Sequence, residues 1–268
     1  MTNSQKLAVV TGAATGIGAG LSREAAKRGY RVLLADRNET ALVRTAAAIP
    51  GADYCVTDVT DPLQMMALAE RADGLGGADL LFNNAGVMTT GFTWEIPAAD
   101  WDRAIAINVG GVLNGARAFI PRMIARNRPA QIVNTASVGG FLPSPLMAPY
   151  SATKFAVVAI TEAMQCELEL LGAPISMSLL APGPVLSEIF ANPFGGDAHP
   201  ATAQFVEMMK DMTALHGMGA DDFAALVFQG IDRGDYWIVP QPEALDPSLQ
   251  ARHEMIRDRR RPTGSMTG

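Results

Sequence analysis

Short apolar stretches and longer helical stretches alternate along almost the whole chain. This alternation is typical of βαβ units, which place parallel strands in one sheet and helices on its faces. The expected strands are apolar along their length, as is usual when both faces of a sheet are covered. They are Leu7–Val10, Arg31–Ala35, Asp53–Val56, Leu80–Phe82, Gln131–Thr135, Ile175–Leu180 and Tyr236–Val239. The pattern predicts a doubly wound α/β fold with a parallel sheet of about seven strands.

Helical patterns fill the gaps between these strands. The expected helices are Ile17–Arg28, Glu39–Ala48, Leu63–Ala72, Ala99–Ala125, Tyr150–Leu171 and Asp221–Asp232. Gly110 and Gly111 interrupt the fourth of them, because glycine weakens or kinks a helix. Neither a repeat nor a linker divides the 268 residues, so we expect one domain over residues 1–268. Within it, 184–218 is expected to form a lid and 259–268 a disordered tail.

Composition argues against several classes of function. The net charge of −6 and the lack of a large basic cluster argue against nucleic-acid binding. Cys55 and Cys166 are far apart and the three histidines are scattered, so we expect no metal site. The N-terminus shows no signal-peptide pattern, and no apolar run reaches the roughly eighteen residues of a membrane span. We therefore expect a cytoplasmic protein without a membrane partner.

A glycine-rich turn follows the first expected strand directly and leads into a helix. It contains Gly12, Thr15, Gly16, Ile17 and Gly18. Glycines let a backbone turn tightly and approach a pyrophosphate, while the helix N-terminus offers unpaired N–H groups. The spacing differs from the common G-x-G-x-x-G fingerprint, and alone it also suits an ordinary turn. After the first strand of an α/β chain, it favours a nucleotide cofactor.

An acidic residue, Asp36, stands at the end of the second expected strand. A carboxylate there can accept hydrogen bonds from both ribose hydroxyls of an adenosine and repels a 2′-phosphate, which favours NAD over NADP. The neighbouring Arg37 leaves NADP open, because a guanidinium binds that phosphate well. Arg37 also suits a surface position at the start of the next helix.

Polar and small residues also follow the third and fourth expected strands. Asp58 and Val59 come after the third strand, and Asn84, Ala85 and Gly86 come after the fourth. In an open parallel sheet, ligands bind beyond the carboxyl ends of the strands. Each residue suits an ordinary turn, but together they predict the rim of one crevice.

Tyr150 and Lys154 stand four residues apart in an expected helix, so their side chains share one face. A free phenol has a pKa of about 10, too high for a general base near neutrality, and a fixed neighbouring cation lowers that pKa. Ser137 precedes Tyr150 by thirteen residues and could hold a substrate oxygen with its hydroxyl. Alone, the Tyr150–Lys154 pair also suits an amphipathic helix with a surface lysine. With the nucleotide turn, it indicates a site that interconverts an alcohol and a ketone.

At this point the chain resembles the short-chain dehydrogenase/reductase family in its single-domain form. The resemblance spans roughly residues 5–240 and rests on motifs in the family's order and spacing. The matching positions are Thr11, Gly12, Gly16, Ile17, Gly18, Asp58, Val59, Asn83, Asn84, Ala85, Gly86, Asn108, Ser137, Tyr150, Lys154, Pro182 and Gly183. The resemblance implies a Rossmann-type fold, a small-molecule alcohol or ketone substrate, and a homodimer or homotetramer.

The resemblance also implies roles for individual residues. Tyr150 is expected to act as general acid/base, and Ser137 to polarise the substrate oxygen. Lys154 is expected to lower the tyrosine pKa and bind the nicotinamide ribose, and Asn108 to hold a water in a proton relay. The expected cofactor contacts are Gly12, Thr15, Gly16, Ile17, Gly18, Asp36, Arg37, Asp58, Val59, Asn84, Ala85, Gly86, Tyr150, Lys154, Pro182, Gly183, Val185 and Ser187.

The segments expected to enclose the substrate carry few charges. Besides Ser137 and Tyr150, we expect contacts from Val138, Phe141, Met147, Met88 and Phe190. Leu142, Leu186, Ile189, Phe194, Phe205, Met208, Met209 and Met212 lie in the same segments. Methionine adapts to irregular apolar shapes, so we expect a largely apolar ketone or secondary alcohol. Equally, these methionines could simply pack the lid onto the core.

Two other functions stay open. An NADPH-dependent reductase of 3-oxoacyl thioesters would need a basic docking surface and a phosphate-tolerant ribose site, and Arg37 alone hints at the second. A non-catalytic, nucleotide-sensing protein would not require Asn108, Ser137, Tyr150 and Lys154 together. The segment after Val239 could cover the active site or extend an interface between subunits.

Overall fold

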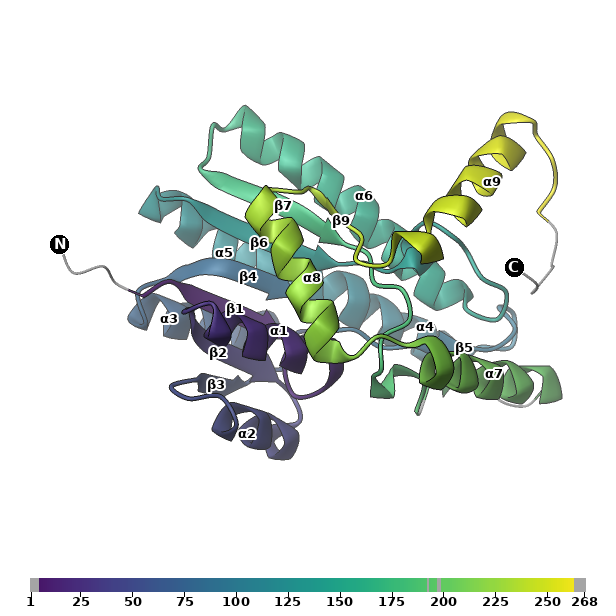
Figure 1. Cartoon of the computed structure of the whole chain (residues 1–268), viewed down its shortest axis with the longest axis horizontal. Helices are drawn as coiled ribbons and strands as arrows, with labels where there is room; N and C mark the ends of the chain where they lie inside the picture. Colours follow the sequence, from purple (N-terminus) through teal and green to yellow (C-terminus); the bar gives the residue numbers. More distant parts are fainter. Residues whose placement is uncertain (1–4, 192, 197–198, 263–268) are drawn as a thin grey trace.

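The computed structural model describes residues 5–191, 193–196 and 199–262, and it contains a parallel sheet with helices on both faces (Figure 1). Its strands lie in the order β3-β2-β1-β4-β6-β7-β9. Their bounds are β1 Leu7–Thr11, β2 Arg31–Asp36, β3 Asp53–Val56, β4 Ala78–Asn83, β6 Ala130–Thr135, β7 Ile175–Leu180 and β9 Trp237–Ile238. All six strand pairs are parallel. The predicted doubly wound α/β fold is therefore confirmed.

Two layers of helices cover the sheet. α1 (Gly16–Lys27), α2 (Glu39–Ala47) and α8 (Ala220–Arg233) pack on one face, and α3 (Pro62–Gly74), α5 (Gly111–Arg126) and α6 (Ala148–Leu170) pack on the other. Successive side chains of a strand point to opposite faces. In β1, Ala8 and Val10 accordingly pack in the first layer, and Leu7 and Val9 in the second.

The strand order reverses between β1 and β4, which lie side by side at the centre of the sheet. One half of the chain continues outward from β1 through β2 and β3, and the other continues from β4 through β6, β7 and β9. The connections that leave the carboxyl ends of β1 and β4 therefore run in opposite directions. Such a switch point is where open α/β sheets bind their ligands.

The long helix predicted over Ala99–Ala125 is broken in the middle. It consists of α4 (Ala98–Ile105), a π-helical turn over Ala106–Gly110, and α5. The interruption lies where Gly110 and Gly111 were expected to weaken the helix. Gly111 also allows close packing, because a Cβ there would lie 2.9 Å from Cγ2 of Val59. Asn108 lies inside the π-helical turn, a distortion that is frequent at functional sites.

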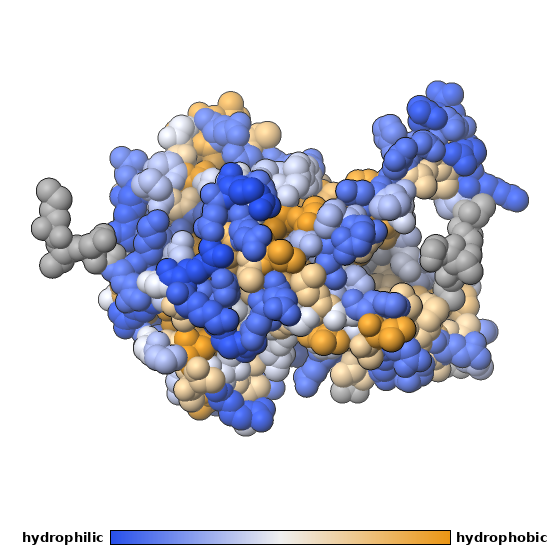
Figure 2. Space-filling model, viewed as in Figure 1, coloured by the Kyte–Doolittle hydropathy of each residue, from blue (hydrophilic) through white to orange (hydrophobic). Residues whose placement is uncertain are grey.

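Two short strands and two helices of the described residues were not predicted. β5 (Thr89–Thr90) and β8 (Phe194–Gly195) form a small second parallel sheet. α7 (Pro200–His216) occupies much of the expected lid, of which residues 192, 197 and 198 lie outside the described part. α9 (Asp246–Arg257) has no buried residue and projects from the body as a mostly hydrophilic arm (Figures 1 and 2).

Of the expected tail, residues 259–262 follow α9 and are exposed, and residues 263–268 lie outside the described part of the chain. The expected domain also includes residues 1–4, which the structure does not describe. Within the described residues, every helix is too short or too polar to span a lipid bilayer.

Candidate active site

The glycine-rich turn between β1 and α1 has a backbone that only glycine fits. Gly12 and Gly16 have φ values of +65° and +52°, in the left-handed region. A Cβ on Gly18 would overlap the carbonyl oxygen of Gly12 and lie 2.8 Å from Nδ2 of Asn84. Thr15 is the N-cap of α1, but its side chain makes no capping hydrogen bond. The N–H groups of the first turn therefore remain suited to an anion such as a pyrophosphate.

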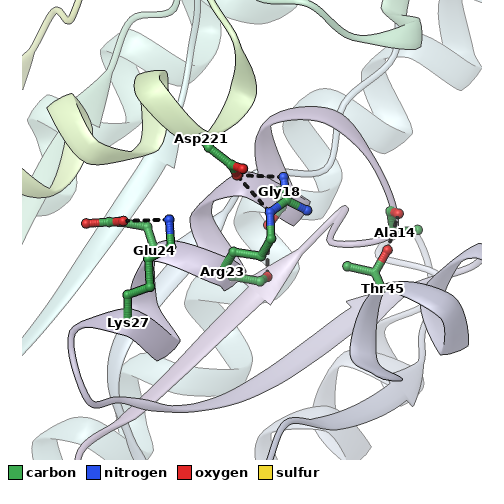
Figure 3. A network of polar contacts seen from close by, with 8 residues as sticks. Ala14, Gly18, Arg23, Glu24, Lys27, Thr45 and Asp221 are labelled. Carbon is green, nitrogen blue, oxygen red and sulfur yellow. Dashed lines mark hydrogen bonds and ion pairs between the residues drawn. The ribbon is translucent and has the colours of Figure 1, made fainter. Parts of the chain in front are cut away.

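Side chains on neighbouring helices fix the turn from outside (Figure 3). The hydroxyl of Thr45 in α2 donates to the carbonyl oxygen of Ala14 at 2.7 Å. Arg23 of α1 forms a 2.7 Å ion pair with Asp221 of α8 (Figure 3). α2 thus holds the turn itself, and α8 holds the helix that follows it.

Thr11 joins the ends of β1 and β4 at the switch point. Its hydroxyl donates to the carbonyl oxygen of Phe82 at 3.1 Å and accepts from the N–H groups of Asn84 and Ala85 at 2.9 and 3.2 Å. The side-chain amide of Asn84 donates back to the carbonyl oxygen of Thr11 at 3.0 Å. The two loops that would flank a cofactor therefore form one unit.

Asp36 is held firmly at the end of β2. One carboxylate oxygen accepts from the N–H of Ala14 at 3.1 Å and the other from the N–H of Asn38 at 2.9 Å. Arg37 is exposed and has no ion-pair partner within the described ranges. Both lie on one pocket, whose lining residues are Gly12, Asp36, Arg37, Thr57, Asp58, Val59, Ala85, Gly86, Val87 and Ile107.

Asp58 lines this pocket, and one oxygen of its carboxylate is already hydrogen-bonded within the loop. Oδ1 accepts from both the N–H and the hydroxyl of Thr60, at 2.9 and 2.8 Å. The N–H of Asp58 donates to the side chain of Gln64 at 2.8 Å. One oxygen of the side chain therefore shapes its own loop, and Asp58 and Val59 both line the pocket.

Tyr150 and Lys154 are buried one turn apart near the N-terminus of α6. Nζ of Lys154 lies 5.8 Å from the centre of the Tyr150 ring and donates to the carbonyl oxygen of Thr135 at 2.8 Å. Gly86 passes close by, since a Cβ there would lie 3.4 Å from that Nζ. The predicted pair is therefore brought to the carboxyl ends of β4 and β6.

Ser137 lies against Tyr150 because Gly139 has no side chain. Oγ of Ser137 accepts from the N–H of Gly139 at 3.0 Å, which orients the hydroxyl. A Cβ on Gly139 would lie 3.2 Å from Cε1 of Tyr150 and 3.5 Å from that Oγ. The two hydroxyl-bearing side chains can thus face the same substrate oxygen.

Burial controls the protonation of the site. It raises the pKa of the Tyr150 phenol above its ordinary value, and the hydrogen bond with the Ser137 side chain acts in the opposite direction. Burial also lowers the pKa of Lys154 to about 8. The expected lowering of the Tyr150 pKa by Lys154 is therefore opposed by desolvation, which penalises the phenolate. A phenol that keeps its proton is suited to protonating a ketone oxygen.

Asn108 ties the loop after β4 to α6. Its side chain accepts from the N–H of Val87 at 2.8 Å and donates to the carbonyl oxygen of Val87 at 3.1 Å and to the hydroxyl of Thr153 at 3.0 Å. Thr153 in turn donates to the carbonyl oxygen of Tyr150 at 2.7 Å. The expected proton relay through a water on Asn108 stays a prediction. Thr153 was missed, although it lies within the Tyr150–Lys154 motif.

The loop after β7 reaches back to the glycine-rich turn. A Cβ on Gly16 would lie 3.1 Å from Cβ of Ser187, so these predicted cofactor residues are neighbours. Val185 is buried and pairs with Met218, and the N–H of Leu186 donates to the carbonyl oxygen of Met218 at 2.9 Å. The loop is therefore bonded to Met218, which follows α7.

An apolar cluster packs around the aromatic ring of Tyr150. It consists of Met88, Met147, Tyr150, Phe190 and Phe205, with Leu146, Ile189 and Met209 at its border. Three of the predicted substrate contacts, Met88, Met147 and Phe190, are thus brought together.

Ile189, Phe205 and Met209 join them, but several other expected apolar residues lie outside this cluster. Phe141 packs in a separate cluster and against the ring of Trp237, with 5.9 Å between ring centres. This contact spans almost a hundred residues of chain, so local pattern could not reveal it. Val138 is only partly buried, and its N–H donates to the carbonyl oxygen of Pro182 at 3.0 Å. Met208 and Met212 are 37% and 45% exposed, so they are not part of the cluster around Tyr150.

Comparisons with known proteins agree with this geometry. Residues 6–195 match the sequence model of a family described as short chain dehydrogenase. A C alpha-dehydrogenase of Sphingobium sp. strain SYK-6 is 31% identical over 264 residues, covering 94% of this chain and 86% of the relative. A short-chain dehydrogenase/reductase from Burkholderia phymatum, solved in complex with NAD, matches over all of both chains with a TM-score of 0.92 and 36% identity.

A short-chain dehydrogenase from Sphingobium yanoikuyae was solved in complex with NADPH. It has a TM-score of 0.74 and 25% identity, covering 98% of this chain and 99% of that one. Similar structures thus hold either form of the nicotinamide cofactor.

Proposed function

Because this chain belongs to the short-chain dehydrogenase/reductase family and is therefore an NAD(P)-dependent oxidoreductase, we propose that it interconverts a secondary alcohol and a ketone. The observation that carries this proposal is the convergence of Ser137, Tyr150 and Lys154 at one buried point beside the loops after β4 and β6. We further propose that residues 1–268 act as one catalytic domain with 184–218 as its lid.

Each residue at this point has a separate role in the proposed reaction. The nicotinamide, when bound, carries the hydride. In the direction of reduction, Tyr150 gives its proton to the ketone oxygen, and the Ser137 hydroxyl donates a hydrogen bond to the same oxygen. In oxidation, Tyr150 takes the proton of the alcohol, and the cationic form of Lys154 favours the resulting phenolate. The apolar cluster around Tyr150 excludes water from this exchange.

NAD is the cofactor that we propose. The Asp36 carboxylate is fixed by two backbone N–H groups, and each oxygen keeps a lone pair for a ribose hydroxyl. A fixed negative charge at that position would repel a 2′-phosphate. Arg37 lines the same pocket but is exposed, which supports its interpretation as a surface residue.

The substrate that we propose is largely apolar. The buried apolar side chains that pack with Tyr150 are those of Met88, Met147, Phe190 and Phe205. We also propose a homodimer or homotetramer. This is supported by the exposed small residues Ala152, Ala159 and Ala163 on α6 and by Ile105, which is 47% exposed at the end of α4.

Nicotinamide fluorescence can measure the binding of NADH and NADPH at fixed salt concentration. We expect NADH to bind more tightly to the wild type, and Asp36→Ala to remove most of that preference because it removes the charge that repels the 2′-phosphate. Arg37→Ala is the matched control and should leave the preference unchanged. If NADPH binds more tightly and Arg37→Ala weakens it, the cofactor is NADP.

A panel of secondary alcohols with NAD⁺ then tests the reaction. Reduction of NAD⁺ by apolar alcohols, with little reduction by small charged ones, is the expected result. Turnover of 3-oxoacyl thioesters with NADPH in place of the alcohols would support the thioester reductase. Tight cofactor binding without turnover of either substrate class would support a nucleotide sensor.

A further inference from the structure

The side chain of Gln241 connects the segment after β9 to the loop after β7. Gln241 is 5% exposed and lies just before the short 3₁₀ turn Pro242–Ala244. Its amide oxygen accepts from the N–H of Gly183 at 3.1 Å, and its amide nitrogen donates to the carbonyl oxygen of Pro184 at 2.8 Å. The amide thus bonds to two backbone groups of the loop.

The loop Pro182–Pro184 depends on such a partner because it has little hydrogen-bonding capacity of its own. Both prolines lack an N–H, so Gly183 supplies the single backbone donor of the three residues. That donor is bonded to Gln241. An N–H group that loses its partner inside the protein is costly, so removal of the amide would favour a shifted loop.

Two other contacts hold the loop, and they come from the substrate side. The carbonyl oxygen of Pro182 accepts from the N–H of Val138, next to Ser137, at 3.0 Å. The carbonyl oxygen of Pro184 accepts from the N–H of Met218 as well, also at 3.0 Å. Gln241 contacts the loop from the segment after β9, and unlike Val138 and Met218 it does so through its side chain.

The fit around Gly183 is tight. A Cβ on Gly183 would lie 3.0 Å from the amide oxygen of Gln241 and 3.2 Å from Cβ of Ala244. The loop therefore rests directly on the segment 241–244, and its position depends on that segment.

We propose that Gln241 is a positioning residue for the nicotinamide end of the cofactor site. It acts through the loop Pro182–Val185, which it holds in the position from which the loop contacts the nicotinamide ring. This inference rests on the proposed function, because it assumes that the loop faces a nicotinamide. It assigns a task to the segment after Val239, whose role the sequence left open.

The consequence for binding is selective. ADP-ribose contains the adenosine, the pyrophosphate and the second ribose of the cofactor but has no nicotinamide. A displaced loop should therefore weaken NADH while the binding of ADP-ribose stays unchanged. A displacement of about 1 Å can reduce the rate of a reaction by roughly 10²-fold, so turnover should fall as well.

The test is the substitution Gln241→Met, which keeps the length of the side chain and removes both hydrogen bonds. We expect NADH affinity and kcat to fall roughly tenfold each, and ADP-ribose affinity to stay unchanged. A tenfold loss of rate is smaller than the loss expected for a displacement of about 1 Å. Gln241→Glu retains the acceptor for Gly183 but loses the donor to Pro184, and it should give an intermediate NADH affinity. Gln250→Met is the matched control, because Gln250 is exposed on α9.

Each outcome decides the question. Wild-type NADH affinity and kcat in Gln241→Met would overturn the inference and leave the proposed function intact. Equal loss of NADH and ADP-ribose in both Gln241 variants would also overturn it, since that result indicates a general structural role. If the wild-type protein binds ADP-ribose but not NADH, the proposed function falls and this inference falls with it.

Discussion

The proposed cofactor end and the proposed substrate end of this site are built in different ways. At the cofactor end, backbone groups and a few short polar side chains fix the shape: Gly12 and Gly18 meet without side chains, and Thr11 joins β1 to β4. At the substrate end, long apolar side chains of the lid, such as Phe190 and Phe205, fill the space against Tyr150. Backbone geometry specifies one ligand closely, whereas methionine and phenylalanine can adapt to several.

The two ends also differ in how firmly they are attached. The strands and helices around the cofactor end belong to the two large apolar layers of the sheet. In α7, by contrast, only Thr202, Phe205 and Thr213 are buried, and Leu215 is 76% exposed. Elements with few buried contacts open locally at low cost in free energy. We therefore expect the proposed lid, 184–218, to open locally at a lower cost in free energy than the sheet.

The largest effect on turnover should come from a substitution of Tyr150, which lies between the two ends. Tyr150→Phe removes the proton donor, and kcat should fall by about 10²–10⁴-fold, the usual contribution of general acid–base catalysis. NADH affinity, measured by fluorescence, should change little. Tyr54→Phe on the exposed side of β3 is the matched control and should have wild-type kcat. Near-normal turnover by Tyr150→Phe would remove the assignment of Tyr150 as general acid/base.

Two phenylalanine substitutions, one in the sheet and one in α7, compare how much each region contributes to the free energy of unfolding. Phe82→Ala, at a fully buried position near the end of β4, should lower the free energy of unfolding by about 3–5 kcal/mol. Phe205→Ala should lower it clearly less, because the lid can open locally, and should instead raise the KM for an apolar alcohol. Urea denaturation and steady-state kinetics measure the two quantities. Equal losses of stability would mean that the lid is as firmly integrated as the sheet.

The smallest of these effects concerns the glycine backbone. Gly18→Ala places a Cβ against the Gly12 carbonyl, and forcing an extra methyl group into a packed site costs about 1–3 kcal/mol. We expect a comparable loss of NADH binding energy in a titration. Gly74→Ala is the control, since a Cβ there meets no atom within 4 Å. Unchanged NADH affinity in Gly18→Ala would show that the turn is more adaptable than its geometry indicates.

The same contrast explains what could be predicted from the sequence. The strands and the glycine-rich turn have strong local signals, and residues at the carboxyl ends of parallel strands must share one edge. Asp36, Asp58 and Gly86, which follow three different strands, accordingly line one pocket. Their exact hydrogen bonds, such as that of Lys154 to the Thr135 carbonyl, involve backbone atoms that no residue type reveals.

The elements that were missed lack a local signal. α9 buries no residue, so it has no apolar stripe to show helical periodicity. α7 follows a stretch rich in proline and glycine, and it begins at Pro200 with the side chain of His199 as its cap. β5 and β8 have two residues each, which is too short for an alternating pattern. The position of Gln241 against Gly183 depends on tertiary packing alone.

The small sheet of β5 and β8 has a consequence for anyone who wishes to change the substrate range. It ties Thr89 and Thr90, which directly follow Met88, to Phe194 and Gly195, which belong to the same segment as Phe190. Gly195 leaves no room at this junction, because a Cβ there would lie 3.2 Å from Cγ2 of Thr89 and overlap the carbonyl oxygen of Thr90. A mutant library that varies Met88 or Phe190 singly would therefore contain few variants with a changed substrate range. Libraries that vary both positions together, and keep Gly195, match the way in which the chain couples them.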